Sequence, residues 1–149
     1  MKKILVVCMG NICRSPTGEA VLRATAEKMK LSVEVDSAGT LDFHSGDKPD
    51  HRARTAGEFR GYSFDNIVAR QVTEKDFEYF DLILAADMDN MSNLLGMCPT
   101  EYTHKISLFL SHSESEYNEI PDPFYGGGSG FELVLDLIEE ASVGLLKKL

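Results

Sequence analysis

The chain has no tryptophan, only three cysteines among its 149 residues, and no apolar run near the roughly 18–20 residues that a membrane span needs. Its N-terminus also lacks the apolar segment of a signal peptide. An odd number of cysteines argues against a secreted disulfide framework and favours a reducing compartment. We therefore expect a cytoplasmic protein that makes no use of a membrane.

Basic residues are scarce as well. The 15 lysines and arginines are outnumbered by 24 aspartates and glutamates, which gives a net charge of −9. A nucleic-acid backbone is therefore excluded as the main partner, because phosphate contacts along it need a basic surface. A small phosphorylated ligand is not excluded, since a nest of N–H groups and one arginine can dominate inside a pocket.

Metal-binding patterns are missing too. His44 and His51 have no cysteine or second histidine at metal-ligand spacing, so we interpret both as solvated loop residues. We expect neither a metal nor another cofactor.

The length and the 43% hydrophobic content suit a single domain spanning residues 1–149. Strand and helix patterns alternate along the chain, which favours an α/β fold with a parallel sheet covered on both faces. The sequence predicts strands at residues 3–8, 31–37, 81–86 and 104–108. It predicts helices from about residue 15, at 50–60, 74–79 and 87–95, and from Phe131 toward the C-terminus. Residues 111–130 read as a long loop, and a loop of that length in a compact domain is usually functional.

The run from Cys8 to Pro16, C-M-G-N-I-C-R-S-P, carries the strongest chemical signal. Cys8 ends an apolar strand pattern, and Arg14, after five intervening residues, opens a helix pattern. The bare Cys-to-Arg spacing is a weak signal, and its place between a strand and a helix strengthens it. In open parallel sheets ligands bind at the carboxyl ends of the strands, where this run must lie.

Each residue type in this run suits attack on a phosphate group. A helix N-terminus and a nearby cation favour the thiolate form of a cysteine, which makes Cys8 a candidate nucleophile. Arg14 offers a planar fork for two phosphate oxygens, and Ser15 can donate a hydrogen bond to the thiolate. Asn11 is expected to hold the loop open. The backbone N–H groups of the loop would bind the phosphate oxygens, and the predicted phosphate-binding loop comprises Met9, Gly10, Asn11, Ile12, Cys13, Arg14 and Ser15. The sequence therefore predicts a cysteine-dependent phosphatase.

These residues resemble the low-molecular-weight protein tyrosine phosphatases over nearly the whole chain. The matching motifs are C-M-G-N-I-C-R-S-P at 8–16, D-S-A-G-T at 36–40, V-A-R-Q-V-T at 68–73, D-L-I-L-A-A-D at 81–87 and P-D-P-F-Y-G at 121–126. The first and the last are specific, and they stand at the right ends of one chain.

The resemblance implies a four-stranded parallel sheet with helices on both faces, and a metal-free, two-step hydrolysis of phosphotyrosine and small aryl phosphates. By this resemblance Cys8 matches the nucleophile, Arg14 the phosphate-binding arginine and Asp122 the general acid. Asn11, Ser15 and Ser37 match the polar network that shapes the loop. The expected partner is a phosphotyrosine-containing protein, such as a tyrosine kinase, and we expect the enzyme to act as a monomer.

Chemistry also supports Asp122 as the acid. A phenolate leaving group needs a proton, and the water that later attacks the phosphoenzyme needs a base, so one carboxyl group can serve both steps. Phe124 and Tyr125, together with Phe43 in the loop at 41–48, are expected to form the wall of the substrate pocket.

Two further residues raise hypotheses. Many family members have a histidine just before V-A-R-Q that supports the asparagine, and here the residue is Ile67, which predicts a thinner supporting network. Cys8 and Cys13 lie on one short loop, so peroxide could convert the sulfenate of Cys8 into a disulfide with Cys13.

Three alternatives remain open. Arsenate reductases share this loop but resolve the arsenate adduct with two further cysteines, whereas here Cys98 stands alone in the later part of the chain. Protein-arginine phosphatases have threonine in the middle of the loop where this chain has Ile12, and an apolar Ile12 better suits an aryl ring. A phosphopeptide-binding module without turnover belongs to another class, and the set Cys8, Arg14 and Asp122 argues against it.

Overall fold

Strand β1 (Lys2–Cys8) lies inside the sheet because its sequence is apolar on both faces, and it pairs in parallel with β2 (Val33–Gly39) and β3 (Leu82–Ala85). The computed structural model describes residues 1–123 and 128–149, and within them the strand order is β2-β1-β3-β4, with all pairs parallel. Strand β4 (Ile106–Leu108) forms one edge. The carboxyl ends of all four strands therefore meet at one edge of the sheet.

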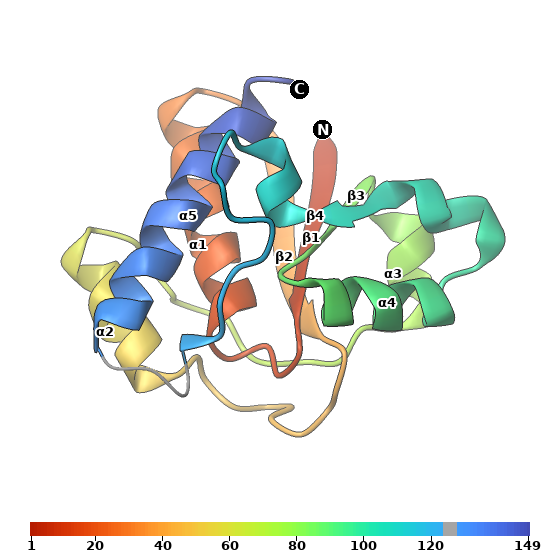
Figure 1. Cartoon of the computed structure of the whole chain (residues 1–149), viewed down its shortest axis with the longest axis horizontal. Coiled ribbons are helices and arrows are strands. Elements are labelled where there is room, and N and C mark those ends of the chain that lie inside the picture. The colour runs from red at the N-terminus through yellow and green to blue at the C-terminus, as the bar shows by residue number, and fades with distance from the viewer. Residues whose placement is uncertain (124–127) are drawn as a thin grey trace.

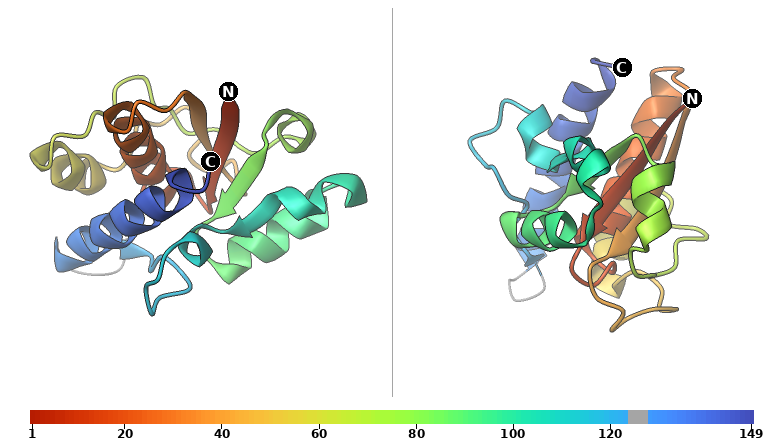
Figure 2. Two further views of the ribbon diagram at one scale, coloured as in Figure 1. Left: turned by 90° about the horizontal axis from the view of Figure 1, so that it is seen from above. Right: turned by 90° about the vertical axis from the view of Figure 1, so that its right-hand side faces the viewer.

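Helices cover both faces of this sheet (Figures 1 and 2). Helices α1 (Arg14–Lys28) and α5 (Gly128–Leu146) pack on one face, and α3 (Glu74–Tyr79) and α4 (Met88–Met97) on the other. Helix α2 (His51–Phe59) packs beside α5. The prediction of a four-stranded parallel sheet between two helical layers is confirmed.

Alternating side chains of β1 supply the two hydrophobic cores. Ile4, Val6 and Cys8 belong to the core under α1 and α5. Leu5 and Val7 belong to the core on the opposite face. All of these side chains are buried, so the strand is anchored from both faces and the position of Cys8 at its end is fixed by the sheet.

Several element boundaries differ from the predicted ones. Residues 104 and 105, expected at the start of the last strand, instead end the 3-10 helix η1 (Thr100–Lys105). A second short helix, η2 (Phe109–His112), extends into the segment predicted to be a loop. Helix α5 already begins at Gly128. No helix in the described ranges is long and apolar enough to cross a membrane.

His112, at the end of η2, ties β4 to the last turns of the chain. The ammonium of Lys148 donates to its Nδ1 at 2.7 Å, and its Nε2 lies 3.0 Å from Oγ of Ser107. An ammonium only donates, so Nδ1 accepts and Nε2 must carry the proton that goes to Ser107. Burial first, and then the charge of Lys148, lowers the pKa of His112 below its usual value of 6.5.

This lowered pKa predicts a loss of stability in mild acid. The unfolded chain binds a proton at His112 more readily than the folded one, so the free energy of unfolding should decrease as the pH falls from about 7 through the ordinary histidine pKa of about 6.5. His112→Gln should flatten this decrease, and His104→Gln, at an exposed residue of η1, should leave it unchanged. Urea unfolding at several pH values measures the free energy of unfolding. If it changes equally with pH in the wild type and in His112→Gln, His112 is not the group responsible.

Candidate active site

Residues 9–13 join β1 to α1 and pass close to the end of β2. Asn11 has φ 57°, a left-handed conformation that asparagine adopts more readily than most residues. A Cβ atom on Gly39 would lie only 2.7 Å from the carbonyl oxygen of Met9 and 3.2 Å from the nitrogen of Asn11. Glycine at position 39 therefore allows the loop to lie against the neighbouring strand.

The sulfur of Cys8 lies at the N-terminus of α1. Its side chain is 3% exposed, and its Sγ is 3.0 Å from Oγ of Ser15. The backbone N–H of Ser15 also donates to Sγ, at 3.4 Å. Two donors in the first turn of the helix, together with the helix dipole, suit a negatively charged sulfur.

A chain of hydrogen bonds holds the serine in place. Nδ2 of Asn11 donates to Oγ of Ser15 at 2.7 Å, and the backbone N–H of Arg70 donates to Oδ1 of Asn11 at 3.0 Å. The guanidinium of Arg70 in turn pairs with Asp36 and Asp76. Because Ser15 accepts the proton of Asn11, its own proton can go to the sulfur at 3.0 Å or to the carbonyl oxygen of Ala38 at 3.4 Å, and the sulfur is the nearer of the two.

Ile67 and Ser37 lie outside this chain of hydrogen bonds. Ile67 is buried in an apolar cluster with Ala20 and Phe64, so its side chain offers nothing to Asn11, whose acceptor is satisfied by a backbone N–H instead. The hydroxyl of Ser37 donates to Glu19 at 2.6 Å. Glu19 is itself buried and pairs with Arg23, and burial is the main cause that raises its pKa.

Arg14 is fixed by acceptors from two distant segments. Its Nη1 donates to Oδ2 of Asp87 at 2.7 Å and to the carbonyl oxygen of Ile120 at 3.0 Å. Its side chain is 5% exposed. Burial opposes the charge, but Cys8 and Asp87 more than offset it, so the pKa of Arg14 is raised and the guanidinium stays charged. A buried, oriented arginine beside the sulfur suits a phosphate group.

Asp87 is a site residue that the sequence reasoning did not assign. Its Oδ1 accepts the N–H of Asn90 as the N-cap of α4, and its Oδ2 accepts from Arg14. The available signal was the place of this aspartate directly after the strand in the D-L-I-L-A-A-D motif. Asp87 therefore links α4 to the phosphate-binding arginine, Arg14.

Replacing Asp87 separates its two contacts. Asp87→Ser keeps an N-cap oxygen but cannot reach Arg14, whereas in Asp87→Asn the single amide oxygen can accept from Arg14 at the expense of the N-cap. We expect kcat/KM for an aryl phosphate to fall about 10–100-fold in Asp87→Ser, the range expected for loss of a charged hydrogen bond, and clearly less in Asp87→Asn. Steady-state kinetics and thermal unfolding of both variants check this. Equal losses of kcat/KM in the two variants would contradict the idea that Asp87 orients Arg14.

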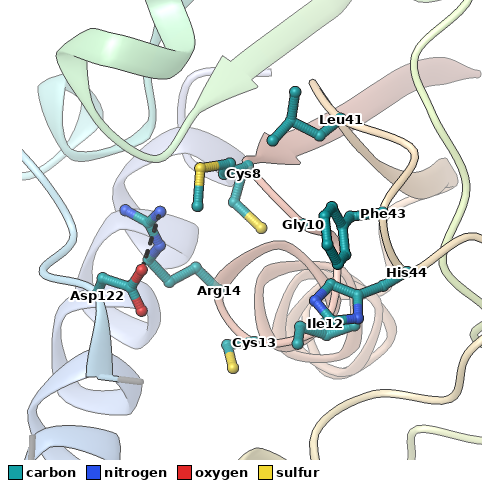
Figure 3. A pocket seen from close by; sticks show the side chains of 10 residues that line it. Cys8, Gly10, Ile12, Cys13, Arg14, Leu41, Phe43, His44 and Asp122 are labelled. Atoms are coloured by element: carbon teal, nitrogen blue, oxygen red, sulfur yellow. Dashed lines mark ion pairs between the residues drawn. The ribbon is translucent and has the colours of Figure 1, made fainter. Parts of the chain in front are cut away.

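Asp122 faces the same opening as Arg14 (Figure 3). Its Oδ2 lies 3.9 Å from Nη2 of Arg14, and its side chain is about one-third exposed. Two residues earlier, the N–H of Ile120 donates to the carbonyl oxygen of Ala86, which ties this segment to the end of β3. Phe124 and Tyr125, predicted to form the pocket wall, lie outside the described residues.

Cys8, Arg14 and Asp122 line one cavity of about 300 Å³, a size suited to a small ligand. Phe43 lies on its wall, opposite Asp122 in Figure 3. The other lining residues are Met9, Gly10, Ile12, Cys13, Leu41 and His44. His44 is a partly exposed loop residue, as predicted, and in addition it lines the cavity, which the sequence did not indicate. Its ring lines the cavity and lies 3.2 Å from a carboxylate oxygen of Asp47, because the loop after β2 turns back over Gly10.

Cys13 also lines the cavity but differs from Cys8 in its surroundings. It is 7% exposed, and burial, followed by the charge of Asp50, raises its pKa to about 12. Cys13 is therefore a neutral thiol at ordinary pH. Because the thiolate is the attacking form, any disulfide formation with an oxidised Cys8 is slowed. The Cys8–Cys13 pair stays a prediction.

Comparisons with known proteins agree on one family. The family model described as low molecular weight phosphotyrosine protein phosphatase matches residues 3–149. A Synechocystis sp. protein whose name includes low molecular weight protein-tyrosine-phosphatase is 44% identical, covering 99% of this chain and 96% of that protein. A low molecular weight protein-tyrosine-phosphatase of Streptomyces coelicolor is 41% identical over 97% of this chain and 91% of its own.

A solved structure gives the same result. The crystal structure of the protein tyrosine phosphatase from Entamoeba histolytica with Hepes in the active site has a TM-score of 0.96 and 42% identity, covering 99% of this chain and 96% of that one. The match spans the sheet, both helical layers and the loop after β1. The chain therefore belongs to the low molecular weight phosphotyrosine protein phosphatase family.

Proposed function

We propose that this phosphatase hydrolyses phosphotyrosine through a phosphate ester of Cys8, with Arg14 binding the phosphate and Asp122 acting as acid and base. One observation carries the proposal: the buried sulfur of Cys8, hydrogen-bonded by Ser15, lines the same cavity as Arg14 and Asp122. A nucleophile, a fixed cation and a proton donor around one small cavity are what phosphate transfer to a thiolate requires.

In the first step the thiolate of Cys8 attacks phosphorus and the bond from phosphorus to the phenolic oxygen breaks. The electron pair of that bond goes to the oxygen, which takes a proton from the protonated carboxyl group of Asp122. Arg14 and the N–H groups of residues 9–14 stabilise the negative charge on the equatorial oxygens. The phenol leaves, and Cys8 carries the phosphoryl group.

In the second step water attacks the phosphorus of the phosphocysteine. Asp122, now a carboxylate, takes a proton from the water, the sulfur–phosphorus bond breaks, and inorganic phosphate is released. The hydroxyl of Ser15, 3.0 Å away, stabilises the departing thiolate. The enzyme returns to its starting state without any other reactant.

The cavity favours an aryl phosphate as substrate. Ile12, Leu41 and Phe43 give it apolar walls next to the phosphate-binding loop. A phosphoarginine would place a charged guanidinium against Ile12, at a cost in desolvation. Phosphotyrosine-containing proteins, a tyrosine kinase among them, are thus the proposed partners. Further parts of the proposal are a cytoplasmic location, in line with the three free thiols, and action as a single-domain monomer over residues 1–149.

Cys98 is poorly placed for the thiol relay of an arsenate reductase. It follows α4, whose other end carries Asp87 at the site. Ten helical residues span about 15 Å at 1.5 Å per residue, so the thiol of Cys98 is remote from Cys8. Cys13 has too high a pKa to act as a ready attacking thiolate.

The test is phosphate release from an aryl phosphate in the presence of a metal chelator, followed by acid quenching and mass spectrometry of the peptide that contains Cys8. We expect turnover unaffected by the chelator and one phosphoryl group on Cys8 in the quenched enzyme. Tight binding of phosphotyrosine with no release of phosphate would instead establish a binding module.

A further inference from the structure

Three exposed apolar side chains follow the carboxyl ends of three neighbouring strands. Leu41 follows β2, Met9 follows β1 and Met88 follows β3, and they are 47%, 45% and 52% exposed. We call these three residues the apolar row. Apolar side chains gathered at one place on the surface of a folded protein commonly mark a binding surface.

Backbone pairing places Leu41 beside Met9 and brings the segment that leads to Met88 alongside β1. The N–H of Leu41 donates to the carbonyl oxygen of Met9 at 3.0 Å, so the two residues are direct neighbours. On the other side of β1, Val7 pairs with Ala85, and the N–H of Ala86 donates to Val7. Adjacent strands lie about 4.8 Å apart, so the carboxyl ends of β2, β1 and β3, after which the three residues follow, span roughly 10 Å.

Met88 extends the row beyond the cavity. Met9 and Leu41 line the cavity that contains Cys8, whereas Met88 is not among its lining residues. The preceding residue, Asp87, turns its carboxylate to Arg14, and the backbone N–H of Met88 donates to Glu119. The polar groups at this position are thus engaged, and the thioether side chain remains at the surface.

Two residues of the apolar row, Met9 and Leu41, also line the cavity, so the row is suited to bind a peptide whose phosphotyrosine lies in the cavity. A polypeptide held at Cys8 through its phosphotyrosine must leave the cavity over some part of its rim. An extended chain advances about 3.3 Å per residue, so residues within three positions of the phosphotyrosine can reach a row about 10 Å long. Leucine, isoleucine or phenylalanine there would bury apolar surface against Met88, and a charged or very small residue would not.

We propose that the apolar row selects substrates with a large apolar residue within three positions of the phosphotyrosine, and that Met88 is the specificity-determining residue outside the cavity. This inference rests on the proposed function of Cys8. It concerns only the part of the substrate that a small aryl phosphate lacks, so the two can be tested separately.

The experiment compares phosphotyrosyl peptides that carry leucine, glycine or aspartate at each position from −3 to +3. The wild-type enzyme should show a kcat/KM about tenfold higher for the best leucine peptide than for its glycine counterpart, a gain typical of one apolar contact. In Met88→Ser this ratio should fall toward one, while kcat/KM for an aryl phosphate stays unchanged. Met97→Ser, at an exposed methionine near the other end of α4, is the matched control and should keep the wild-type ratio.

Two outcomes would overturn the inference while leaving the proposed function intact. One is an aryl phosphatase that treats leucine, glycine and aspartate peptides alike. The other is a leucine preference that survives in Met88→Ser to the same degree as in Met97→Ser. Failure of the wild type to release phosphate from any substrate would overturn both the proposed function and this inference.

Discussion

Cys8→Ser should reduce the turnover of aryl phosphates to the background rate, a loss of at least about 10⁴-fold. Serine has nearly the same shape, but its hydroxyl is not ionised by the donors that surround the sulfur at 3.0 and 3.4 Å. No covalent intermediate can then form. Steady-state kinetics together with acid-quench mass spectrometry would show neither phosphate release nor a phosphorylated peptide.

Binding provides the internal control for this variant. Arg14 and the N–H groups of the loop remain in Cys8→Ser, so inorganic phosphate should still bind, which calorimetry can measure. Cys98→Ser, at a partly buried thiol outside the site, should retain wild-type turnover. Turnover in Cys8→Ser comparable to that of Cys98→Ser would refute cysteine catalysis.

Asp122→Asn should lower kcat by roughly 10²–10⁴-fold for a phosphate ester whose leaving phenol needs a proton. Asparagine keeps the size of the side chain at the cavity mouth but removes its ability to give and take a proton, together with its charge 3.9 Å from Arg14. KM should change little, because the phosphate is bound by the loop and by Arg14. Measurement of kcat and KM at several pH values separates the two effects.

The leaving group decides whether this loss comes from acid catalysis. With a phenol acidic enough to leave without protonation, the first step is spared in Asp122→Asn, while attack by water still lacks its base. Phosphocysteine should then accumulate, giving a burst of phenol followed by slow turnover. A loss that is the same for acidic and weakly acidic phenols, with no burst, would show that Asp122 has only a structural role.

The sequence predicts those parts of the fold and the site whose residues are close together in the chain. The apolar strand, the loop from Cys8 to Ser15 and the helix behind it occupy one continuous stretch, so the sequence reveals both the nucleophile and the phosphate-binding loop. The 3.6-residue period of the last helix is equally local, although the helix begins at Gly128, ahead of the apolar residues that made it recognisable.

Contacts between distant segments could not be predicted in this way. Arg14 and Asp87 are 73 residues apart in the sequence. They meet because β1 pairs with β3, which brings the carboxyl ends of these two strands together. The acceptor of Ser37 is the buried carboxylate of Glu19 on α1, 18 residues away in the sequence. A buried glutamate looks like a solvent-facing one until its serine and arginine partners are known.

The boundaries of the last strand show the same limit. Residues 104 and 105 belong to η1, and only Ile106–Leu108 pair with β3, a register that the local sequence pattern does not contain. The position of His44 on the cavity wall could not be predicted for a related reason. Its loop turns back over Gly10, and nothing in the spacing of residues 41–48 fixes that direction.

The central place of β1 in the sheet has a consequence for how the enzyme is made. The nucleophile leaves the ribosome before the acceptors of Arg14, which lie 73 and 106 residues beyond Arg14. At about 5–20 residues per second, translation delivers these partners roughly 4–20 seconds after the thiol. Until β2 and β3 enclose β1, Cys8 is not yet fixed at the end of a buried strand, and Arg14 lacks the acceptors that orient it. The pair that binds and attacks the phosphate is therefore completed only after most of the chain has been made, although its two residues lie six positions apart.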